Sequence, residues 1–147
     1  LSGLVGSEMC IRDRLMDDVL AMATRPLLVS HGGVEGTCPG TRNLSDRHIR
    51  AIAATGGVIG IGYWDTAVCA TSVTAIVKAI RYTADLVGVE HVALGSDFNG
   101  TIHAPFDVTG LAQLTEGLLG AGFSRDDIAA IMGGNVQRLL LASLPTH

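Results

Sequence analysis

Leu27-Leu28-Val29-Ser30-His31 is an apolar run that ends in a histidine, and Arg42-Asn43 begins eleven residues after that histidine. The pattern predicts a buried strand with an imidazole at its carboxyl end and an arginine on the loop behind it. Enzymes built from parallel β/α units place their sites at the carboxyl ends of strands, and an arginine there suits an anionic substrate. This stretch therefore predicts a strand of a parallel sheet and one side of a binding site.

A second apolar run has the same form. Val92-Ala93-Leu94-Gly95-Ser96-Asp97 is apolar almost to its last residue, a carboxylate, and Phe98-Asn99-Gly100 predicts a turn directly after it. Because the carboxyl ends of parallel strands lie at one edge of a sheet, His31 and Asp97 are expected to belong to the same site.

Strands and helices alternate along the chain from Leu15 onward. Periodicity and capping residues predict helices near residues 15–22, 46–55, 73–87, 111–119, 126–132 and 135–141, and strands near 27–31, 58–63 and 92–97. Single helices between strands predict right-handed parallel β/α units. An eight-stranded barrel takes ~250 residues, so this chain would supply only the last three strands of one. A doubly wound open sheet is the competing architecture.

Glycines within the predicted strand give Gly57-Val58-Ile59-Gly60-Ile61-Gly62 a superficial likeness to a dinucleotide-binding loop. A loop of that kind follows its strand, whereas these glycines lie inside one. No nucleotide cofactor is therefore expected, and the glycines are expected to let neighbouring side chains pack closely.

Composition narrows the class of protein. The chain has 147 residues, is 48% hydrophobic and has a formal charge of −4, which predicts a soluble globular domain with one core. Lysine and arginine form no cluster, so no nucleic-acid partner is expected, and no apolar run is long enough for a membrane span. The three cysteines, Cys10, Cys38 and Cys69, are odd in number and lack CxxC spacing. This predicts a reducing compartment without a disulfide scaffold, and the cytoplasm as the expected location.

Residues 1–14 (LSGLVGSEMCIRDR) show neither clear periodicity nor a capping pattern that connects them to the rest of the chain. The run from Val5 to Arg14 resembles a peptide that recurs at the broken ends of conceptual translations from environmental DNA. We therefore expect residues 1–14 to be an artefactual leader and residues 15–147 to be the C-terminal fragment of a barrel domain. A frayed natural terminus is the alternative.

Five short motifs occur in a defined order. They are Ser30-His31, Arg42-Asn43-Leu44-Ser45-Asp46, Gly56-Gly57-Val58-Ile59-Gly60, Gly95-Ser96-Asp97-Phe98-Asn99-Gly100 and Gly133-Gly134-Asn135-Val136-Gln137-Arg138. Their order and spacing resemble the membrane (renal-type) dipeptidase family, from about Leu15 to Leu141. The resemblance implies an α/β fold, with about three βα units from the C-terminal portion of a metal-dependent β/α (TIM-like) barrel. That family hydrolyses dipeptides, some with a D-residue at the carboxyl end, and uses two zinc ions bridged by a glutamate.

The resemblance also implies roles for three residues. His31 resembles the family's last histidine ligand, at the end of the sixth barrel strand, and would bind one zinc ion through its neutral imidazole. Arg42 resembles the residue that holds the substrate's terminal carboxylate, which suits a planar guanidinium. Asp97 resembles the acid/base carboxylate at the end of strand eight. The alternatives are a hydrogen-bonded loop histidine, a surface arginine and a turn aspartate.

The family's other metal-binding residues have no counterpart in this chain. Its first strand carries a His-x-Asp pair, which does not occur here, a middle strand carries the bridging glutamate, and strand five carries another histidine. We therefore expect the complete parent enzyme to hydrolyse dipeptides and the 147-residue chain alone to be inactive. Two other interpretations stay open: another amidohydrolase-type metal-dependent barrel hydrolase, and a non-catalytic barrel fragment. The expected partner is a dipeptide, and a homo-oligomer is compatible with the sequence.

Overall fold

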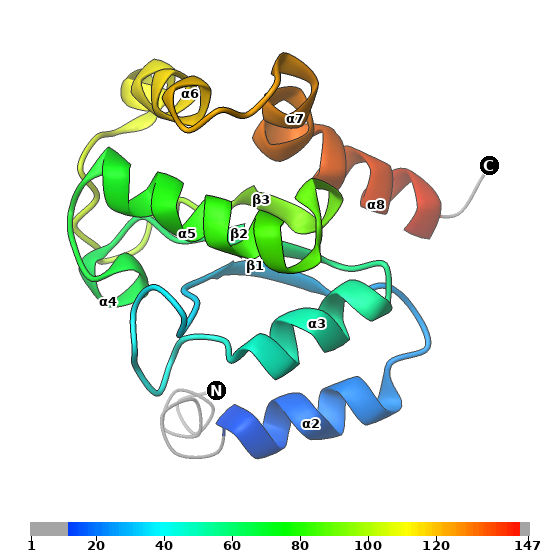
Figure 1. The fold of residues 1–147 in the computed structure, drawn as a ribbon. Helices are drawn as coiled ribbons and strands as arrows, with labels where there is room; N and C mark the ends of the chain where they lie inside the picture. The colour runs from blue at the N-terminus through cyan, green and yellow to red at the C-terminus, as the bar shows by residue number, and fades with distance from the viewer. Residues whose placement is uncertain (1–11, 145–147) are drawn as a thin grey trace.

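Three short strands form the centre of the computed structural model, which describes residues 12–144 (Figure 1). The strands β1 (Leu28–Gly32), β2 (Val58–Ile61) and β3 (Val92–Leu94) make one parallel sheet in the order β1-β2-β3. Val29 pairs with Ile59, which pairs in turn with Val92. The predicted α/β class with parallel strands is confirmed.

Helices precede, connect and follow the strands. They are α2 (Arg12–Met22), α3 (Asp46–Ala54), α4 (Asp65–Val68), α5 (Val73–Val87), α6 (Leu111–Gly120), α7 (Arg125–Ala129) and α8 (Asn135–Ser143), with the shorter helical turns η1 (Val89–His91), η2 (Val108–Gly110) and η3 (Ala130–Gly134). Helices α3 and α5 pack side by side along the sheet, and α2 packs against α3 (Figure 1). The chain therefore returns through helices between successive strands, as parallel pairing requires.

Local sequence signals explain where the connecting helices begin and end. The Ser72 hydroxyl accepts the backbone N–H of Ala75 and begins α5, while Gly88, with φ of 101°, ends it. Ser45 begins α3 in the same way by accepting the backbone N–H of His48. Such caps satisfy backbone groups that a helix leaves unpaired at its ends. The predicted bounds of α5 agree with the structure because both of its caps are local.

The first predicted strand, 27–31, is shifted by one residue in β1, and the other two predicted strands are longer than the observed ones. The runs 58–63 and 92–97 leave the regular ladder after Ile61 and Leu94. Helix α4 begins only four residues after β2 ends and was not predicted. A helix of four residues is too short to show a helical period in the sequence.

The core lies between the sheet and its helices. Ile59, Ile61 and Tyr63 come from alternate positions along β2 and just beyond it, and all three are fully buried. The large, fully buried side chains that the helices add to this core include Ile49, Ile52, Ile76, Ile80, Leu114 and Leu118. Burial of one such side chain contributes about 1.5–3 kcal/mol. Val58 and Ala93 pack instead against Leu139 of α8.

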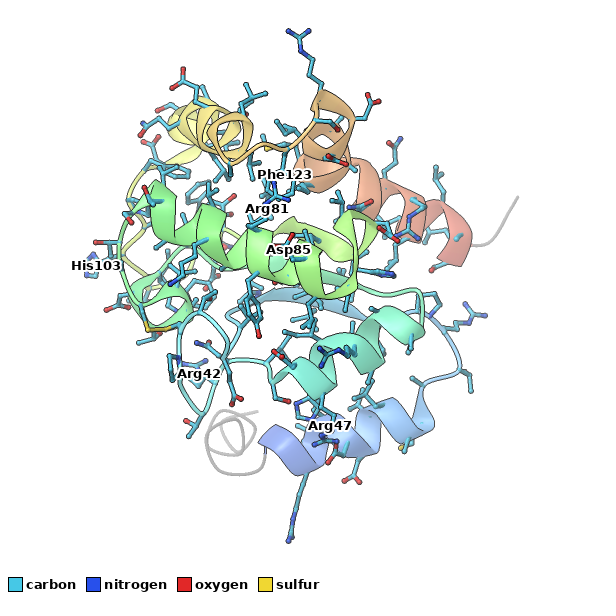
Figure 2. All side chains as sticks on the ribbon, in the orientation of Figure 1. Arg42, Arg47, Arg81, Asp85, His103 and Phe123 are labelled. Atoms are coloured by element: carbon cyan, nitrogen blue, oxygen red, sulfur yellow. A yellow bond between two sulfur atoms is a disulfide. The ribbon has the colours of Figure 1, made fainter. Side chains whose placement is uncertain are left out.

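Specific polar contacts fasten the later helices to the sheet. The Asn135 side-chain amide donates to the carbonyl oxygens of Val89 and Val92, each at 2.8 Å. Arg81 of α5 lies over the Phe123 ring, with its guanidinium carbon 3.4 Å from the ring centre (Figure 2). These contacts join α8 to β3, and α5 to the segment between α6 and α7.

The expectation that the chain has no disulfide is wrong. Cys38 and Cys69 form a disulfide with their Cα atoms 5.2 Å apart, and Cys10 lies outside the described residues. The two cysteines are 31 residues apart, and such spacing gives no local signal of pairing. Because disulfides persist mainly in oxidising compartments, the argument for a reducing compartment loses its premise. A cytoplasmic location stays an untested prediction.

The predicted leader, residues 1–14, falls mostly outside the described residues. Its last three residues form the first part of α2, which begins at Arg12. The division of the chain at residue 14 stays a prediction.

In residues 12–144, no helix has the length and apolar character needed to cross a membrane.

Candidate active site

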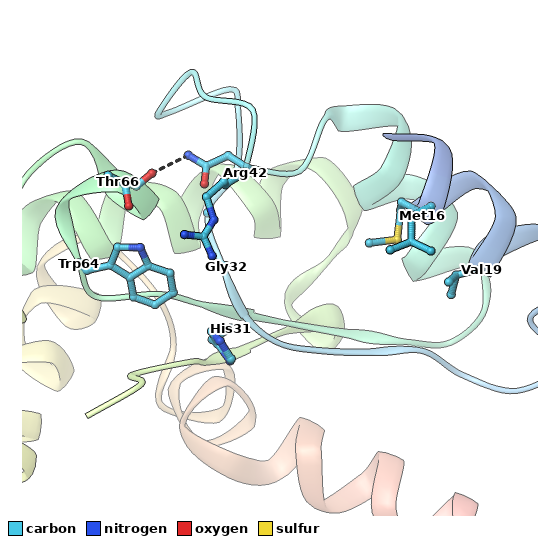
Figure 3. A pocket seen from close by; sticks show the side chains of 10 residues that line it. Met16, Val19, His31, Gly32, Arg42, Trp64 and Thr66 are labelled. Carbon is cyan, nitrogen blue, oxygen red and sulfur yellow. Dashed lines mark hydrogen bonds between the residues drawn. The ribbon is translucent and has the colours of Figure 1, made fainter. Parts of the chain in front are cut away.

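A pocket of about 320 Å³ opens at the carboxyl end of β1 (Figure 3). Its lining comes from the end of β1, the loop after it, the segment after β2, and α2: His31, Gly32, Gly33, Arg42, Asn43, Trp64, Thr66, Leu15, Met16 and Val19. The structure thus brings His31 and Arg42 to one pocket. In Figure 3 the Arg42 side chain extends from its loop toward Trp64 and His31.

His31 stands exposed at the end of β1. Its Nδ1 atom lies 2.9 Å from the hydroxyl oxygen of Ser30. Its ring meets the Trp64 ring in an edge arrangement, with 5.8 Å between the ring centroids. A histidine held at one nitrogen can use the other to bind a metal or to exchange a proton.

The loop that carries Arg42 is fastened beside the pocket by Asn43, which is buried. The Asn43 side-chain nitrogen lies 2.7 Å from the carbonyl oxygen of Cys38, 3.1 Å from that of Thr66 and 3.3 Å from that of Ala67. Because Thr66 and Ala67 belong to α4, this amide ties the loop after β1 to the segment after β2.

Two further features support the same connection. A β-carbon at Gly33 would collide with the Asn43 side chain and the Ala67 carbonyl oxygen, so only glycine fits there. The Cys38–Cys69 disulfide links the same two segments covalently. Sequence reasoning selected Arg42 but gave no role to Asn43 or Trp64. For Asn43 the available signal was its place next to Arg42 in a five-residue motif.

Asp97 follows β3 and is not among the residues that line the pocket of His31 and Arg42. Its φ of 54° is a left-handed conformation that residues other than glycine rarely adopt. The Gly100 N–H donates to its carbonyl oxygen at 2.8 Å, which closes the predicted turn. A β-carbon on Gly95 would lie only 2.8 Å from the Cα of His31. The chain therefore passes close to His31 just before Asp97, without bringing Asp97 into the pocket.

Three rings are here called the aromatic cluster: Phe98 and Phe106 belong to the segment after Asp97, and they pack against Tyr63, which follows β2. The Tyr63 ring centroid lies 5.6 Å from that of Phe98 and 5.4 Å from that of Phe106. Tyr63 is fully buried, and this burial raises the pKa of its hydroxyl. Within residues 12–144 that hydroxyl has no hydrogen-bond partner. Apolar contacts therefore hold this segment.

The other described histidines lie in different surroundings. His48 is buried, and its Nε2 atom lies 3.2 Å from a carboxylate oxygen of Asp17. A hydrogen bond from Arg47 lowers the pKa of that carboxyl. His91 contacts a backbone carbonyl oxygen through Nδ1 at 2.7 Å. His103 is exposed on the loop after β3 (Figure 2).

The residues that the structure describes do not form a complete metal centre. Among them, no group of three or more histidine, cysteine, aspartate or glutamate side chains is placed to hold a metal ion. The sulfur atoms of Cys38 and Cys69 are bonded to each other. His31 can offer one imidazole nitrogen, which fits one ligand of a zinc site. A metal centre that includes His31 would need donors from outside residues 12–144.

Parallel β/α units with a pocket at the carboxyl end of a strand are typical of β/α enzymes. The sequence model of the membrane dipeptidase family (peptidase family M19) matches residues 10–143. The chain belongs to the membrane dipeptidase family.

Individual relatives agree with this assignment. An uncharacterized protein in the pqqA 5′ region of Klebsiella pneumoniae is 36% identical over 133 residues, which are 84% of this chain and 49% of that protein. The dipeptidase aclJ of Aspergillus oryzae is 34% identical over 130 residues, 83% of this chain and 31% of that protein. The chain therefore spans half or less of the length of these relatives.

Solved structures show the same partial coverage. A metallo peptidase from Rhodobacter sphaeroides, liganded with a phosphinate mimic of the dipeptide L-Ala-D-Ala, has a TM-score of 0.82 and 25% identity. The match covers 88% of this chain and 39% of that one. Dipeptidases of this family are TIM-like barrel enzymes, so the chain has the fold of one part of such a barrel. The fold prediction is confirmed.

Proposed function

We propose that the complete protein is a zinc-dependent dipeptidase and that this chain supplies one side of its active site. The observation that carries the proposal is the pocket shared by His31 and Arg42, in a chain of the membrane dipeptidase family. Membership in a metallopeptidase family supports dependence on a metal. The resemblance of the motifs supports two zinc ions, with most ligands supplied by the rest of the barrel.

Arg42 would bind the terminal carboxylate of the dipeptide. A guanidinium offers parallel N–H donors to both oxygens of a carboxylate. Recognition of a chain terminus at this position would favour short peptides over internal peptide bonds. Because Asn43 and the disulfide already hold the Arg42 loop, little ordering of the backbone would accompany substrate binding.

His31 would be one metal ligand, and Asp97 would transfer a proton from the attacking water to the leaving amine. Zinc, when bound, would activate a water molecule for attack on the peptide carbonyl near neutral pH. The Asp97 carboxylate would accept the proton of that water and deliver it to the leaving amine. Its left-handed backbone would hold the carboxylate at a fixed angle to the end of β3.

The 147-residue chain alone is expected to be inactive, because a single histidine gives little affinity for zinc. The test is incubation of the purified chain with zinc and L-Ala-D-Ala, followed by measurement of free alanine. We expect no more alanine than from the His31→Gln variant. Hydrolysis above that control would contradict the inactivity of the isolated chain.

The role of Arg42 can be tested in the complete protein. Arg42→Ala is expected to raise KM for a dipeptide about tenfold or more, because hydrogen bonds to a charged group contribute about 1.5–3 kcal/mol. Arg125→Ala, at the exposed start of α7, is the matched control and should leave KM unchanged. An unchanged KM for Arg42→Ala would remove Arg42 from the substrate site.

A further inference from the structure

Ser30 and His31 are consecutive residues of β1, yet their side chains meet. In a regular strand, successive side chains point to opposite faces. The register of β1 against β2 shifts between Val29 and Gly32, and this irregularity includes both residues. It allows the Ser30 hydroxyl oxygen to lie 2.9 Å from Nδ1 of His31. The contact is therefore a product of the bulge in β1.

Trp64 reaches the same imidazole from the segment after β2. The two rings meet at 67° in an edge arrangement. Gly62 makes room for the indole, because a β-carbon there would lie 2.5 Å from its Cζ3 atom. The Gly62 N–H also donates to the Gly32 carbonyl oxygen at 2.7 Å, which fixes this segment next to His31. The backbone around Gly62 therefore fixes the position of the indole beside the imidazole (Figure 3).

The positive charge of Arg42 in the pocket favours one of the two possible directions of the hydrogen bond between Ser30 and His31. The hydroxyl could donate to an unprotonated Nδ1 or accept the proton of Nδ1. Arg42 lines the same pocket as His31 and carries only donors. A proton on Nε2 would add another donor to a pocket that contains a cation, whereas a lone pair on Nε2 would be favourable. This favours donation from Nδ1–H to Ser30.

We propose that Ser30 and Trp64 are positioning residues for His31. Ser30 fixes the tautomer of the imidazole, and Trp64 fixes its ring plane. Ser30 accepts the Nδ1 proton, and Trp64 restricts rotation of the imidazole. His31 then presents an unprotonated Nε2 to the pocket, where a metal ion or a proton donor would meet it. The use of Nε2 as a zinc ligand rests on the proposed function, whereas the tautomer does not.

The tautomer can be measured directly on the 147-residue chain without metal. Long-range 1H–15N correlation spectra distinguish Nδ1–H from Nε2–H, and they are recorded at about pH 8.5, well above the ordinary histidine pKa. The His31→Gln variant assigns the His31 signals. A histidine without a partner favours the Nε2–H form, so we expect His31 to differ from exposed His103 and to be mainly Nδ1–H. A His31 that is mainly Nε2–H would overturn the proposal.

Variants of Ser30 separate positioning from general stability. Ser30 is exposed, so its replacement should leave the fold intact. Ser30→Ala should lower the ratio of Nδ1–H to Nε2–H about 3- to 10-fold, the range that one hydrogen bond provides, and Ser30→Thr should restore it. Ser45→Ala is the matched control, because Ser45 makes the same contact with Nδ1 of His48 at 3.0 Å. It should change His48 and leave His31 unchanged. An unchanged ratio in Ser30→Ala would contradict the role of Ser30.

The contribution of Trp64 has its own readout. Trp64→Leu should remove the ring-current displacement of the His31 carbon-bound protons and leave the tautomer ratio unchanged. Unaltered proton shifts would exclude Trp64 as a positioning residue. Failure of the complete protein to hydrolyse dipeptides would refute the proposed function, yet a His31 that is mainly Nδ1–H would still support this inference.

Discussion

The loop after β1 carries Arg42 and the loop after β3 carries Asp97, and the structure holds these two loops in different ways. The loop after β1 bears Arg42, and it is tied to α4 by a disulfide and by the buried amide of Asn43. The segment after β3 bears Asp97, and its Phe98 and Phe106 rings pack against Tyr63 and against each other in the aromatic cluster. The buried hydroxyl in that cluster, on Tyr63, has no partner among the described residues.

The difference shows two ways to place a functional side chain. Hydrogen bonds and disulfides constrain direction, so the loop after β1 depends on a few specific atoms. Apolar packing is non-directional and depends on shape and volume. Removal of single polar groups should therefore destabilise the first region and spare the second.

The largest expected effect is loss of the disulfide. The double substitution Cys38→Ala with Cys69→Ala should lower the free energy of unfolding by about 3 kcal/mol, because the link restricts the unfolded chain. Urea unfolding of both proteins measures the difference. Reductant should lower the stability of the wild type toward that of the variant and leave the variant unchanged. Equal stability of the two proteins would mean that the link contributes nothing.

The next effect concerns the buried amide of Asn43. Asn43→Ala should lower the free energy of unfolding by about 2 kcal/mol, because buried carbonyl groups lose their donor. Asn99→Ala, in the exposed turn after Asp97, is the control and should change stability by less than about 0.5 kcal/mol. If both variants unfold at the same urea concentration, the amide does not hold the Arg42 loop.

In the aromatic cluster, loss of a polar atom should raise the free energy of unfolding, whereas Asn43→Ala should lower it. Tyr63→Phe should raise the free energy of unfolding by up to about 1 kcal/mol, because it removes a buried hydroxyl without a partner. Tyr82→Phe is the comparison, since the Tyr82 hydroxyl donates to Asp46 at 2.6 Å. That variant should be slightly less stable than the wild type in the same thermal unfolding experiment. Marked destabilisation by Tyr63→Phe would show that its hydroxyl does find a partner.

The smallest effect appears only in alkaline solution. Burial raises the pKa of Tyr63 above that of an unfolded tyrosine, which is about 10. The folded state therefore holds this proton more tightly than the unfolded state does. The contribution of Tyr63 to the free energy of unfolding is fully present below pH ~10, and it is lost as the pH rises above that value. Urea unfolding at increasing pH should show a shallower decline for Tyr63→Phe than for the wild type. Parallel declines would contradict the buried state of this hydroxyl.

Much of the fold could be predicted because its signals are local. The apolar run before His31 identified β1, and Gly88 identified the end of α5. The strand after Gly57 was predicted two residues too long, because an apolar sequence does not show where the neighbouring strand stops pairing.

The candidate site was less accessible to sequence reasoning. The structure places His31 and Arg42 in one pocket and leaves Asp97 outside it, and the roles of all three stay predictions. Neither the carbonyl partners of Asn43 in α4 nor the ring beside His31 could be inferred, because they come from residues more than twenty positions away.

By itself, the sequence determined the alternation of strands and helices, because side-chain period and capping act between residues a few positions apart. Its motifs also carried the resemblance to the dipeptidase family. Only the tertiary structure decided that Cys38 pairs with Cys69, that one amide joins two loops, and that Ser30 meets His31 at a bulge. Each of these depends on how separate segments approach or pair with one another, which local sequence patterns do not specify.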